Sequence, residues 1–441
     1  MERTGSDAVT EPVPMALRTM PIDRVFWSHF SPNLGPGGWV TGALIVHMGM
    51  GLRSGLLAIA IGNLLGAVPV ALAAAMGPCT GLPQIEASRR VLGRLGLRPP
   101  AFLNWINCVG WDAVNNVPAA AALIAVLAAG GAALPFPVAL GILVAIQGLA
   151  SVWGHDLVQA LQKYIGMVLV PTLAVVGLLA LFRVGHAPAV AAHPPTLAAF
   201  ALATAVILSF NLSWAPYSSD YTRYLPPDAP PRRVVLLALG GLLGSTIPFQ
   251  LLGLLTAASL PDTAPLAVLG ALRNAAGPLG LLALAAIALS SITGNAVNDN
   301  TAGYSLISAG IRVGRIPAAI ATAAIGYVLA AFGAGRYAEL YSAWLVAALY
   351  WIAPWIGIVL ADWYFRRARP AAAPLPAPLP AWTAEATAFV VIAPLTAILF
   401  GASELYTGPV ARLLGGADIG YYVGFVSAAG CTLVLRRRGA A

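Results

Sequence analysis

Apolar residues fill the chain in long runs, and polar residues collect between the runs. Each run is about 20 residues long, the length that an α-helix needs to cross a hydrocarbon core of about 30 Å. The runs lie at 26–47, 55–76, 103–127, 134–152, 163–182, 196–216, 234–256, 278–298, 316–334, 342–362, 384–402 and 418–436. This pattern predicts an all-α polytopic membrane protein with twelve transmembrane helices.

Two of the runs contain residues that interrupt helices. The first run contains "SPNLGPGGW" (31–39), and the sixth contains "FNLSWAPYSSDYTRYLP" (210–226). Unpaired backbone groups survive in a membrane only where they line a cavity or are buried by protein. The two interruptions are five spans apart, at matching positions of two halves with opposite orientation, which is typical of inverted-repeat transporters that bind substrate at the breaks. The alternative is a simple kink, because Pro and Gly are common in membrane helices.

The same pattern divides the chain into four parts. Residues 1–24 are predicted to form a flexible cytoplasmic tail. Residues 25–365 form a ten-helix transport core with repeats at about 25–185 and 196–365. A Pro/Ala linker at 366–382 is expected to be extended and semi-rigid. Residues 383–441 hold two peripheral helices and a basic C-terminus.

The distribution of charge predicts the orientation. The sequence is 59% hydrophobic and 9% charged, with a net charge of +8. Of the 24 Lys and Arg residues, all but five fall on the side of the predicted spans that also holds both termini; the five are Arg53, Arg183, Arg273, Arg336 and Arg412. The positive-inside rule therefore predicts cytoplasmic termini in the cytoplasmic (inner) membrane. It explains the basic residues as topology signals rather than as a nucleic-acid surface.

The sequence gives no support to an enzyme. Cys79, Cys108 and Cys431 are far apart and show neither disulfide nor metal spacing. There is no Asp-rich diphosphate motif, no His–Glu metal pair and no nucleophile paired with a base. We expect no catalytic residue and no cofactor.

The third run carries a polar helical face. Spacings of three and four residues place the members on one side of a helix: Asn104, Asn107, Trp111, Asn115 and Pro118. Such a face is expected to point away from lipid. Trp111 one turn before Asn115 suits a flat heterocycle, because the ring stacks and the amide reads the edge. Alternatively, the amides join neighbouring helices.

Aspartates accompany two of the polar faces. Asp112 is adjacent to Trp111, and an ionisable group at this depth is a candidate proton carrier. It could instead hydrogen bond to Asn116. Asp299 follows the eighth run and is expected at the cytoplasmic mouth.

In the sixth run, Phe210 and Trp214 are separated by one helical turn. An aromatic side chain here would lie opposite Trp111 and complete a stacking sandwich. The alternative for Trp214 is an interfacial position near the charged residues that follow.

The eighth run ends in a cluster of neutral oxygen-bearing side chains. Ser291, Asn295 and Asn298 share a face, and Ser290 and Thr293 lie beside it. Together with backbone carbonyls of the first break around Gly35, they suit a monovalent cation such as sodium. Alternatively, the hydroxyls bond back to their own helix.

Four stretches carry a family resemblance. "NLLGAVPVALAAAMGPCTGLPQIEASRRVLG" (63–93), "GWDAVNNVP" (110–118), "SWAPYSSDYTRYLP" (213–226) and "YSLIS" (304–308) resemble the purine–cytosine permease branch of the nucleobase–cation symporter family. The resemblance runs through about residues 25–365. It implies a LeuT-like 5+5 inverted-repeat core with two peripheral helices, and import of a purine, pyrimidine or related base driven by Na⁺ or H⁺.

The resemblance also implies roles for particular residues. Trp111 and Asn115 correspond to the substrate-binding pair of the third span, Trp214 to the aromatic residue of the sixth span with Phe210 as second choice, and Asn298 to the substrate amide of the eighth span with Asn295 beside it. Asn33 is the expected substrate contact in the first span, and the sodium-site hydroxyls fall at 290–293.

The sequence therefore predicts a symporter whose partners are a heterocyclic base, a monovalent cation and the lipid bilayer, acting as a monomer without nucleic acid. Two alternatives keep the scaffold and change the substrate, to a pyrimidine precursor of thiamine or to an amino acid. A third alternative is a sensor that binds without transporting.

Overall fold

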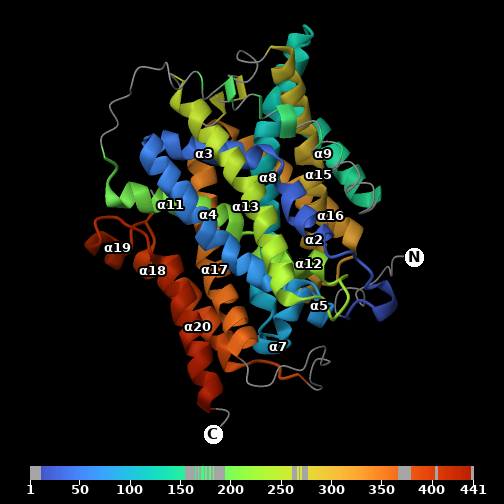
Figure 1. The fold of residues 1–441 in the computed structure, drawn as a ribbon, viewed down its shortest axis with the longest axis vertical. Coiled ribbons are helices and arrows are strands. Elements are labelled where there is room, and N and C mark those ends of the chain that lie inside the picture. The colour runs from blue at the N-terminus through green and yellow to red at the C-terminus, as the bar shows by residue number, and fades with distance from the viewer. Residues whose placement is uncertain are drawn as a thin grey trace.

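The computed structural model describes residues 11–153, 194–260, 277–365, 379–402 and 406–438, with isolated positions within 164–182 and 266–270. Most of these residues are helical (Figure 1). The longer helices are α4 (Leu52–Ala74), α8 (Arg98–Ala129), α9 (Phe136–Trp153), α11 (Leu197–Leu212), α13 (Pro231–Ala258), α15 (Pro278–Ser308), α16 (Arg315–Gly333), α17 (Tyr337–Phe365), α18 (Ala384–Phe400) and α20 (Gly420–Arg438). Short helices α5 (Gly77–Thr80), α6 (Gln84–Ala87) and α7 (Arg89–Leu92) follow α4, and α19 (Pro409–Leu413) precedes α20.

The helices agree with the apolar pattern. Every predicted run except 163–182 coincides with one or more helices. Half of the residues of 163–182 lie outside the described residues, and the other half are helical. Among the described residues, six helical stretches are long and apolar enough to cross a membrane: Leu52–Thr80, Arg98–Ala129, Leu197–Thr222, Pro231–Ala258, Pro278–Ser308 and Ile316–Phe365. The count of twelve spans and the 5+5 repeat stay predictions.

The predicted break in the first run is confirmed. Helix α2 (Arg24–Phe30) passes into a 3₁₀ turn, η2 (Ser31–Asn33), and α3 (Pro36–His47) begins only after Gly35. The backbone of Gly35 is extended (φ −121°, ψ 178°). Pro36 is the first residue of α3, where its missing N–H costs nothing. Gly35 and Pro36 therefore account for the interruption.

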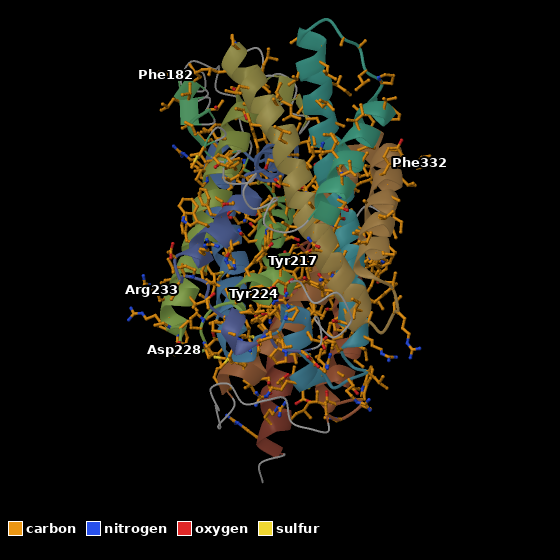
Figure 2. The ribbon with its side chains drawn as sticks, turned by 90° about the vertical axis from the view of Figure 1, so that its right-hand side faces the viewer. Phe182, Tyr217, Tyr224, Asp228, Arg233 and Phe332 are labelled. Atoms are coloured by element: carbon orange, nitrogen blue, oxygen red, sulfur yellow. The ribbon has the colours of Figure 1, made fainter. Side chains whose placement is uncertain are left out.

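The predicted break in the sixth run is also confirmed. Helix α11 ends at Leu212, and a turn leads into the 3₁₀ helix η3 (Ala215–Tyr217) and then α12 (Ser218–Thr222). Pro216 cannot donate a backbone hydrogen bond, which prevents α11 from continuing. Figure 2 shows Tyr217 inside the bundle at mid-height, whereas Asp228 lies towards one end. The break therefore falls in the middle of the bundle.

The broken helices are held by close packing. Helix α3 packs on α13, α11 packs on α4, and α8 packs on α15. A Cβ atom added to Gly42 of α3 would lie 2.0 Å from the carbonyl oxygen of Gln250 in α13. These two helices therefore approach with backbone in contact, which only glycine permits.

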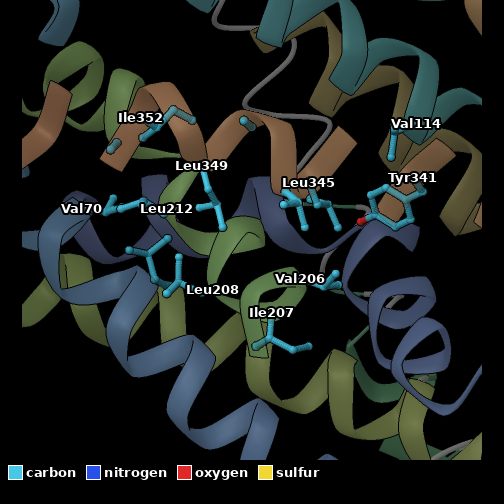
Figure 3. Close-up of a cluster of buried hydrophobic side chains, with 14 of the residues drawn as sticks. Val70, Val114, Val206, Ile207, Leu208, Leu212, Tyr341, Leu345, Leu349 and Ile352 are labelled. Carbon is cyan, nitrogen blue, oxygen red and sulfur yellow. The ribbon is translucent and has the colours of Figure 1, made fainter. Parts of the chain in front are cut away.

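An apolar cluster fixes α11 in its place. Figure 3 shows side chains of α11 packed with residues of α4 and α17. Leu208 and Leu212 of α11 are buried beside Val70 of α4, and Leu349 of α17 lies over them. The hydroxyl of Ser209 donates to the carbonyl of Leu345. The segment before the second break is thereby anchored to two neighbouring helices.

The last helices form one side of the molecule. Helices α18 and α20 pack against each other and against α17, and Figure 1 shows them in red beside the bundle. Arg436 of α20 pairs with Asp362 of α17 (2.7 Å) and with Glu385 of α18 (3.2 Å). Within the predicted linker, residues 366–378 lie outside the described residues, and the carbonyl of Ala381 accepts from the N–H of Leu95 at 2.7 Å.

The N-terminal segment differs from the expected flexible tail. The N–H of Val13 donates to the carbonyl of Gly81 at 2.9 Å, and that of Met20 donates to Tyr224 at 3.0 Å. The Arg18 guanidinium reaches the carbonyl of Pro78 at 3.2 Å and occupies the space where a side chain at Gly81 would stand. Residues 13–20 are therefore attached to the ends of the core helices.

Candidate functional site

A cavity lies where the two breaks meet α8 and α15. It contains about 650 Å³ of space free of atoms, including open solvent at its mouth. Among the predicted site residues, those that line it are Asn33, Gly35, Trp111, Asn115, Phe210, Trp214, Ser290, Ser291 and Asn298. The expected inward orientation of Trp111 and Asn115 is therefore confirmed. Three predicted residues lie behind the wall instead: Asp112, Thr293 and Asn295, each at most 2% exposed.

Aromatic rings form one wall of the cavity. The ring of Phe210 meets the ring of Trp111 edge to face, with centroids 5.7 Å apart and planes at 83°. Tyr341 of α17 contacts Trp111 from another direction, with centroids 6.5 Å apart. The ring that touches Trp111 from α11 is thus Phe210, while Trp214 packs against Tyr217 at 5.5 Å. Trp111 and Trp214 both line the cavity, and whether they sandwich a substrate stays a prediction.

The amide of Asn115 keeps hydrogen-bonding capacity for a ligand. Its Nδ2 donates to Oδ1 of Asn295 at 3.0 Å, which fixes the orientation of the side chain. Its Oδ1 points towards Gly37, where an added Cβ would lie only 3.4 Å away. An amide has two donors and an acceptor with two lone pairs, so one N–H and the oxygen remain for a ligand. Asn295 supports Asn115 and does not itself line the cavity.

The amide of Asn298 forms more hydrogen bonds with the protein than that of Asn115 does. Its Nδ2 donates to the carbonyl of Cys108 at 2.6 Å and to Oδ1 of Asp112 at 2.8 Å. Its Oδ1 accepts from the hydroxyl of Tyr217 at 2.7 Å. One lone pair of the oxygen is therefore all that Asn298 can offer a ligand in this arrangement.

Two buried oxygens at the breaks have no partner among the described residues. Asn33 donates from Nδ2 to the carbonyl of His29 at 2.8 Å, but its Oδ1 accepts nothing. Ser213 is 2% exposed, and its Oγ is also without a partner. Buried polar atoms are rarely left this way without a functional reason. Both residues line the cavity, one at each break.

Comparison with known proteins identifies the family. Residues 12–424 match the model of the family described as "Permease for cytosine/purines, uracil, thiamine, allantoin". The chain belongs to this family. It is 29% identical over 414 residues to YxlA of Bacillus subtilis (strain 168), which is assigned by name to the purine-cytosine permeases, with 90% of this chain and 88% of that protein covered. It is 26% identical over 430 residues to the purine-cytosine permease FCY2 of Saccharomyces cerevisiae (strain ATCC 204508 / S288c), with 90% and 78% covered.

The solved structures show that the permease shares a transporter fold. Mhp1, a nucleobase-cation-symport-1 family transporter in a closed conformation with bromovinylhydantoin bound, superposes with a TM-score of 0.76. The match covers 98% of this chain and 95% of that chain at 16% identity, so it shows the fold alone. Family and fold together identify a multi-pass membrane transporter rather than an enzyme, as the sequence predicted.

One of the hydroxyls expected to bind a cation, that of Ser290, reaches the first break. Ser290 donates from Oγ to the carbonyl of Leu34 at 2.5 Å, and Ser291 donates to the carbonyl of Asn115 at 3.0 Å. Thr293 donates to the carbonyl of Ser290 in its own helix at 3.0 Å, which is the predicted alternative for such residues. The contact of Ser290 with Leu34, next to Gly35, shows that α15 and the break meet where the sequence placed them.

Asp299 is not at the mouth of the permease. It is fully buried, and its Oδ2 accepts from Ser151 of α9 at 2.8 Å. The expectation failed because α15 continues to Ser308, past the last apolar residue of the predicted run. Asp112 is bonded to Gln147 rather than to Asn116, which also donates to Gln147.

Sequence reasoning missed several residues of the site, among them Ser213, Tyr217 and Gly37 of the cavity lining and Gln147 behind it. Ser213 and Tyr217 stand in the recognised break motif, so their position was a usable signal. Gln147 is a single amide within the apolar helix α9, and such a residue has few uses in lipid except to bond other polar groups.

Proposed function

We propose that this permease imports a nucleobase or a related nitrogen heterocycle, such as cytosine or a purine, by alternating access. The observation that supports this most directly is the pairing of a flat ring with a partly unsatisfied amide at one cavity wall. Trp111 offers the face on which a heterocycle stacks, and Asn115 offers one donor and one acceptor towards the same space. The ring nitrogens and exocyclic groups of a base present donors and acceptors along one edge, which is what such an amide reads.

The unpartnered oxygens of Asn33 and Ser213 add to this proposal. They stand at the two breaks, on the other side of the cavity lining from α8. A ligand with N–H groups on more than one edge would satisfy them, because each can accept a hydrogen bond. A small planar base fits these demands better than an apolar ligand, which would leave both oxygens buried and unpaired at a cost of about 1–3 kcal/mol each.

One observation favours an amino acid as the second candidate. Helix α3 begins in the cavity wall, and the N–H groups of Gly37 and Gly38 in its first turn have no carbonyl partner within the helix. Such groups suit a carboxylate. The third candidate is a pyrimidine precursor of thiamine; the family description includes thiamine, and a vitamin B6 transporter of Saccharomyces cerevisiae is 23% identical over 329 residues.

Coupling to a cation, either Na⁺ or H⁺, completes the proposal. For Na⁺, the candidate ligands are the oxygens of Ser290, Ser291 and Thr293 with backbone carbonyls of the break around Gly35. The 2.5 Å contact of Ser290 with the Leu34 carbonyl brings two of these oxygens together. For H⁺, the candidate carrier is Asp112. Either ion acts only through its different affinities for the outward- and inward-facing states.

The proposed setting is the cytoplasmic membrane with both termini inside the cell. The permease would act as a monomer with twelve spans, ten of them in two inverted repeats. The clustering of basic residues on one side of the spans supports this orientation.

A ligand screen tests the proposal. The purified permease is heated with bases, vitamin precursors and amino acids, with and without sodium. A base that binds is expected to raise the unfolding temperature, because ligand at about 100 times its Kd adds about 2.7 kcal/mol of stability. Stabilisation by amino acids alone would refute the nucleobase assignment. Accumulation of the ligand in proteoliposomes distinguishes a transporter from a sensor that only binds.

Substitution of Trp111 supplies the second half of the test. Trp111→Ala should weaken base binding by about 1–3 kcal/mol, the range measured for stacking of bases on aromatic side chains. The control is Phe332→Ala on α16, since Phe332 is 88% exposed and points away from the bundle in Figure 2. Equal affinity of the two variants for the base would remove the stacking wall from the proposal.

A further inference from the structure

Two buried carboxylates stand close together behind the cavity. Asp112 of α8 and Asp299 of α15 each have 0% exposure. Gln147 of α9 donates from Nε2 to Oδ2 of Asp112 at 3.2 Å and to Oδ2 of Asp299 at 3.1 Å. Because one amide nitrogen bonds to an oxygen of each, the two carboxyl groups lie next to each other. The pair therefore joins three helices at one point.

In the described part of the chain, no positive charge compensates this pair. Among the described residues, no Lys, Arg or His forms an ion pair with either carboxylate. The titratable groups that face Asp112 are Cys108 of its own helix, Asp299 of α15 and Tyr217 of η3, and Asp220 of α12 lies farther along the same polar region. Helix α9 contributes only the neutral Gln147 and Ser151, and α16 contributes Gly326, where an added Cβ would lie 2.8 Å from Cβ of Asp112.

The charge of the pair follows from this environment. Two carboxylates that share a buried site cannot both ionise without a large penalty, so one of them is neutral. An independent observation points to where a proton sits. Oδ1 of Asp299 is buried and has no hydrogen-bond partner, although three other oxygens of the pair accept bonds. The neighbouring Oδ1 of Asn116 is also unpartnered.

The pair is connected directly to the substrate cavity. Oδ1 of Asp112 accepts from Nδ2 of Asn298 at 2.8 Å, and Oδ1 of Asn298 accepts from the hydroxyl of Tyr217 at 2.7 Å. Asn298 and Tyr217 both line the cavity, and Tyr217 belongs to the second break. A change in the charge of the pair would change the strength of the bond that Asp112 accepts from Asn298, because bonds to an ionised acceptor are stronger.

We propose that Asp112 and Asp299 together bind one proton and that this proton is the ion which the permease couples to its substrate. The inference rests on the proposed function and selects between its two cations. A proton from the outer water converts one carboxylate of the pair into a carboxylic acid. The same proton returns to water on the inner side once the change of state lets water reach the pair, because hydrated carboxylates can both ionise. The bond between Asp112 and Asn298 carries the effect to the cavity.

The hydroxyl cluster at the first break gives weaker support to sodium. Ser290, Ser291 and Thr293 donate to three different backbone carbonyls, those of Leu34, Asn115 and Ser290, so these bonds do not by themselves gather the hydroxyls around one ion. The buried atoms that lack a partner near α15 are carboxylate and amide oxygens. Each of them can accept a hydrogen bond from a proton held by the pair.

The test compares Asp112→Asn and Asp299→Asn with the control Asp228→Asn. Asp228 is exposed and lies towards one end of the molecule, far from Tyr217 in Figure 2. In proteoliposomes that are acidic outside, wild type and control should accumulate base, whereas both pair variants should lose accumulation driven by the pH gradient. The pair variants should keep exchange of labelled for unlabelled base, because exchange needs no net movement of protons.

Infrared spectroscopy tests the pair without any substrate. Wild type and control should show the carbonyl band of a buried carboxylic acid, and the band should be absent from both Asn variants. Ser151→Ala keeps both carboxylates and removes one donor to Asp299, so it should shift the pH at which the band titrates. This variant tests the pair if the Asn variants do not fold. Absence of the band in wild type, or undiminished gradient-driven accumulation by Asp299→Asn, would overturn the inference. So would accumulation that follows a sodium gradient and ignores pH.

The two readouts separate the two proposals. A band that depends on Asp112 and Asp299 in a protein that neither binds nor moves a base would support the proton site and refute the proposed substrate. Base transport by a protein that lacks the band would support the proposed substrate and refute the proton site.

Discussion

Gly37 controls the width of the cavity, and enlarging it should weaken substrate binding. Gly37 lies in the first turn of α3 and lines the cavity between α8 and α11. The Cβ atom of Gly37→Ala would stand 3.1 Å from Cε2 of Phe210 and 3.4 Å from Oδ1 of Asn115. The added methyl group therefore enters the space between the aromatic wall and the amide that reads the ligand.

The magnitude follows from the contacts around Phe210. Non-bonded carbon atoms prefer a separation of about 3.5–4.0 Å, so the ring must retreat by roughly half an ångström. Its edge-to-face contact with Trp111 at 5.7 Å limits retreat on that side. A bound ligand takes up the remaining space, so the strain appears in the complex more than in the free protein. Overpacking of this kind costs about 1–2 kcal/mol, which raises Kd about 5- to 30-fold.

The assay is equilibrium binding of the base to purified protein by isothermal titration calorimetry. Gly148→Ala on α9 is the matched control, because its Cβ would meet no atom within 4 Å. Both changes remove the same backbone freedom, so both should stabilise helix by a similar amount, about 0.5–1 kcal/mol. If Gly37→Ala binds the base as tightly as Gly148→Ala does, the ligand does not occupy the space between Phe210 and Asn115, and the reasoning fails.

Three further substitutions distinguish residues that affect base binding from residues that only stabilise the fold. Asn295→Leu removes the acceptor that orients Asn115 and should weaken base binding by about 0.5–1.5 kcal/mol, measured by the same titration; unchanged affinity would contradict a positioning role. Asn63→Leu leaves buried polar partners on α11 and α13 unpaired and should lower the free energy of unfolding by about 1–3 kcal/mol, seen as a lower unfolding temperature with base affinity retained. Arg436→Ala removes two ion pairs from carboxylates that are only 6% and 9% exposed, so it should lower the free energy of unfolding by about 1–3 kcal/mol; an unchanged unfolding temperature would contradict this.

The breaks were predictable because Pro and Gly remove or weaken helical hydrogen bonds. In lipid such a loss must be compensated locally, so a cluster of these residues within an apolar run indicates a buried or cavity-lining break. Pro36 and Pro216 mark the positions at which the structure interrupts the first and sixth helices. The inward face of α8 was predictable for a similar reason, since amides at helical spacing cannot face lipid without cost.

The depth of a polar residue in the bundle and the rotation of its helix were harder to predict. The eighth run was ended at 298, where polar residues accumulate, and Asp299 was therefore expected at the surface. In the structure Gln147 and Ser151 of α9 satisfy Asp299 inside the bundle, and no local pattern in α15 reveals partners that come from another helix. Likewise, Asn295 and Asn298 share one stripe of α15, and only the rotation of α15 against α8 decides that Asn298 reaches the cavity.

The four amide side chains near the cavity therefore have two different roles, support and ligand binding. Asn295 and Asn298 form most of their hydrogen bonds with protein groups, and one of these bonds joins Asn298 to Asp112. Asn115 and Asn33 keep atoms that no protein group satisfies. Since an unpaired buried amide is costly, the second pair is where a ligand gains most by binding. Discrimination among bases should then follow changes at Asn115 and Asn33, whereas changes at Asn298 should alter the response to pH as well as affinity.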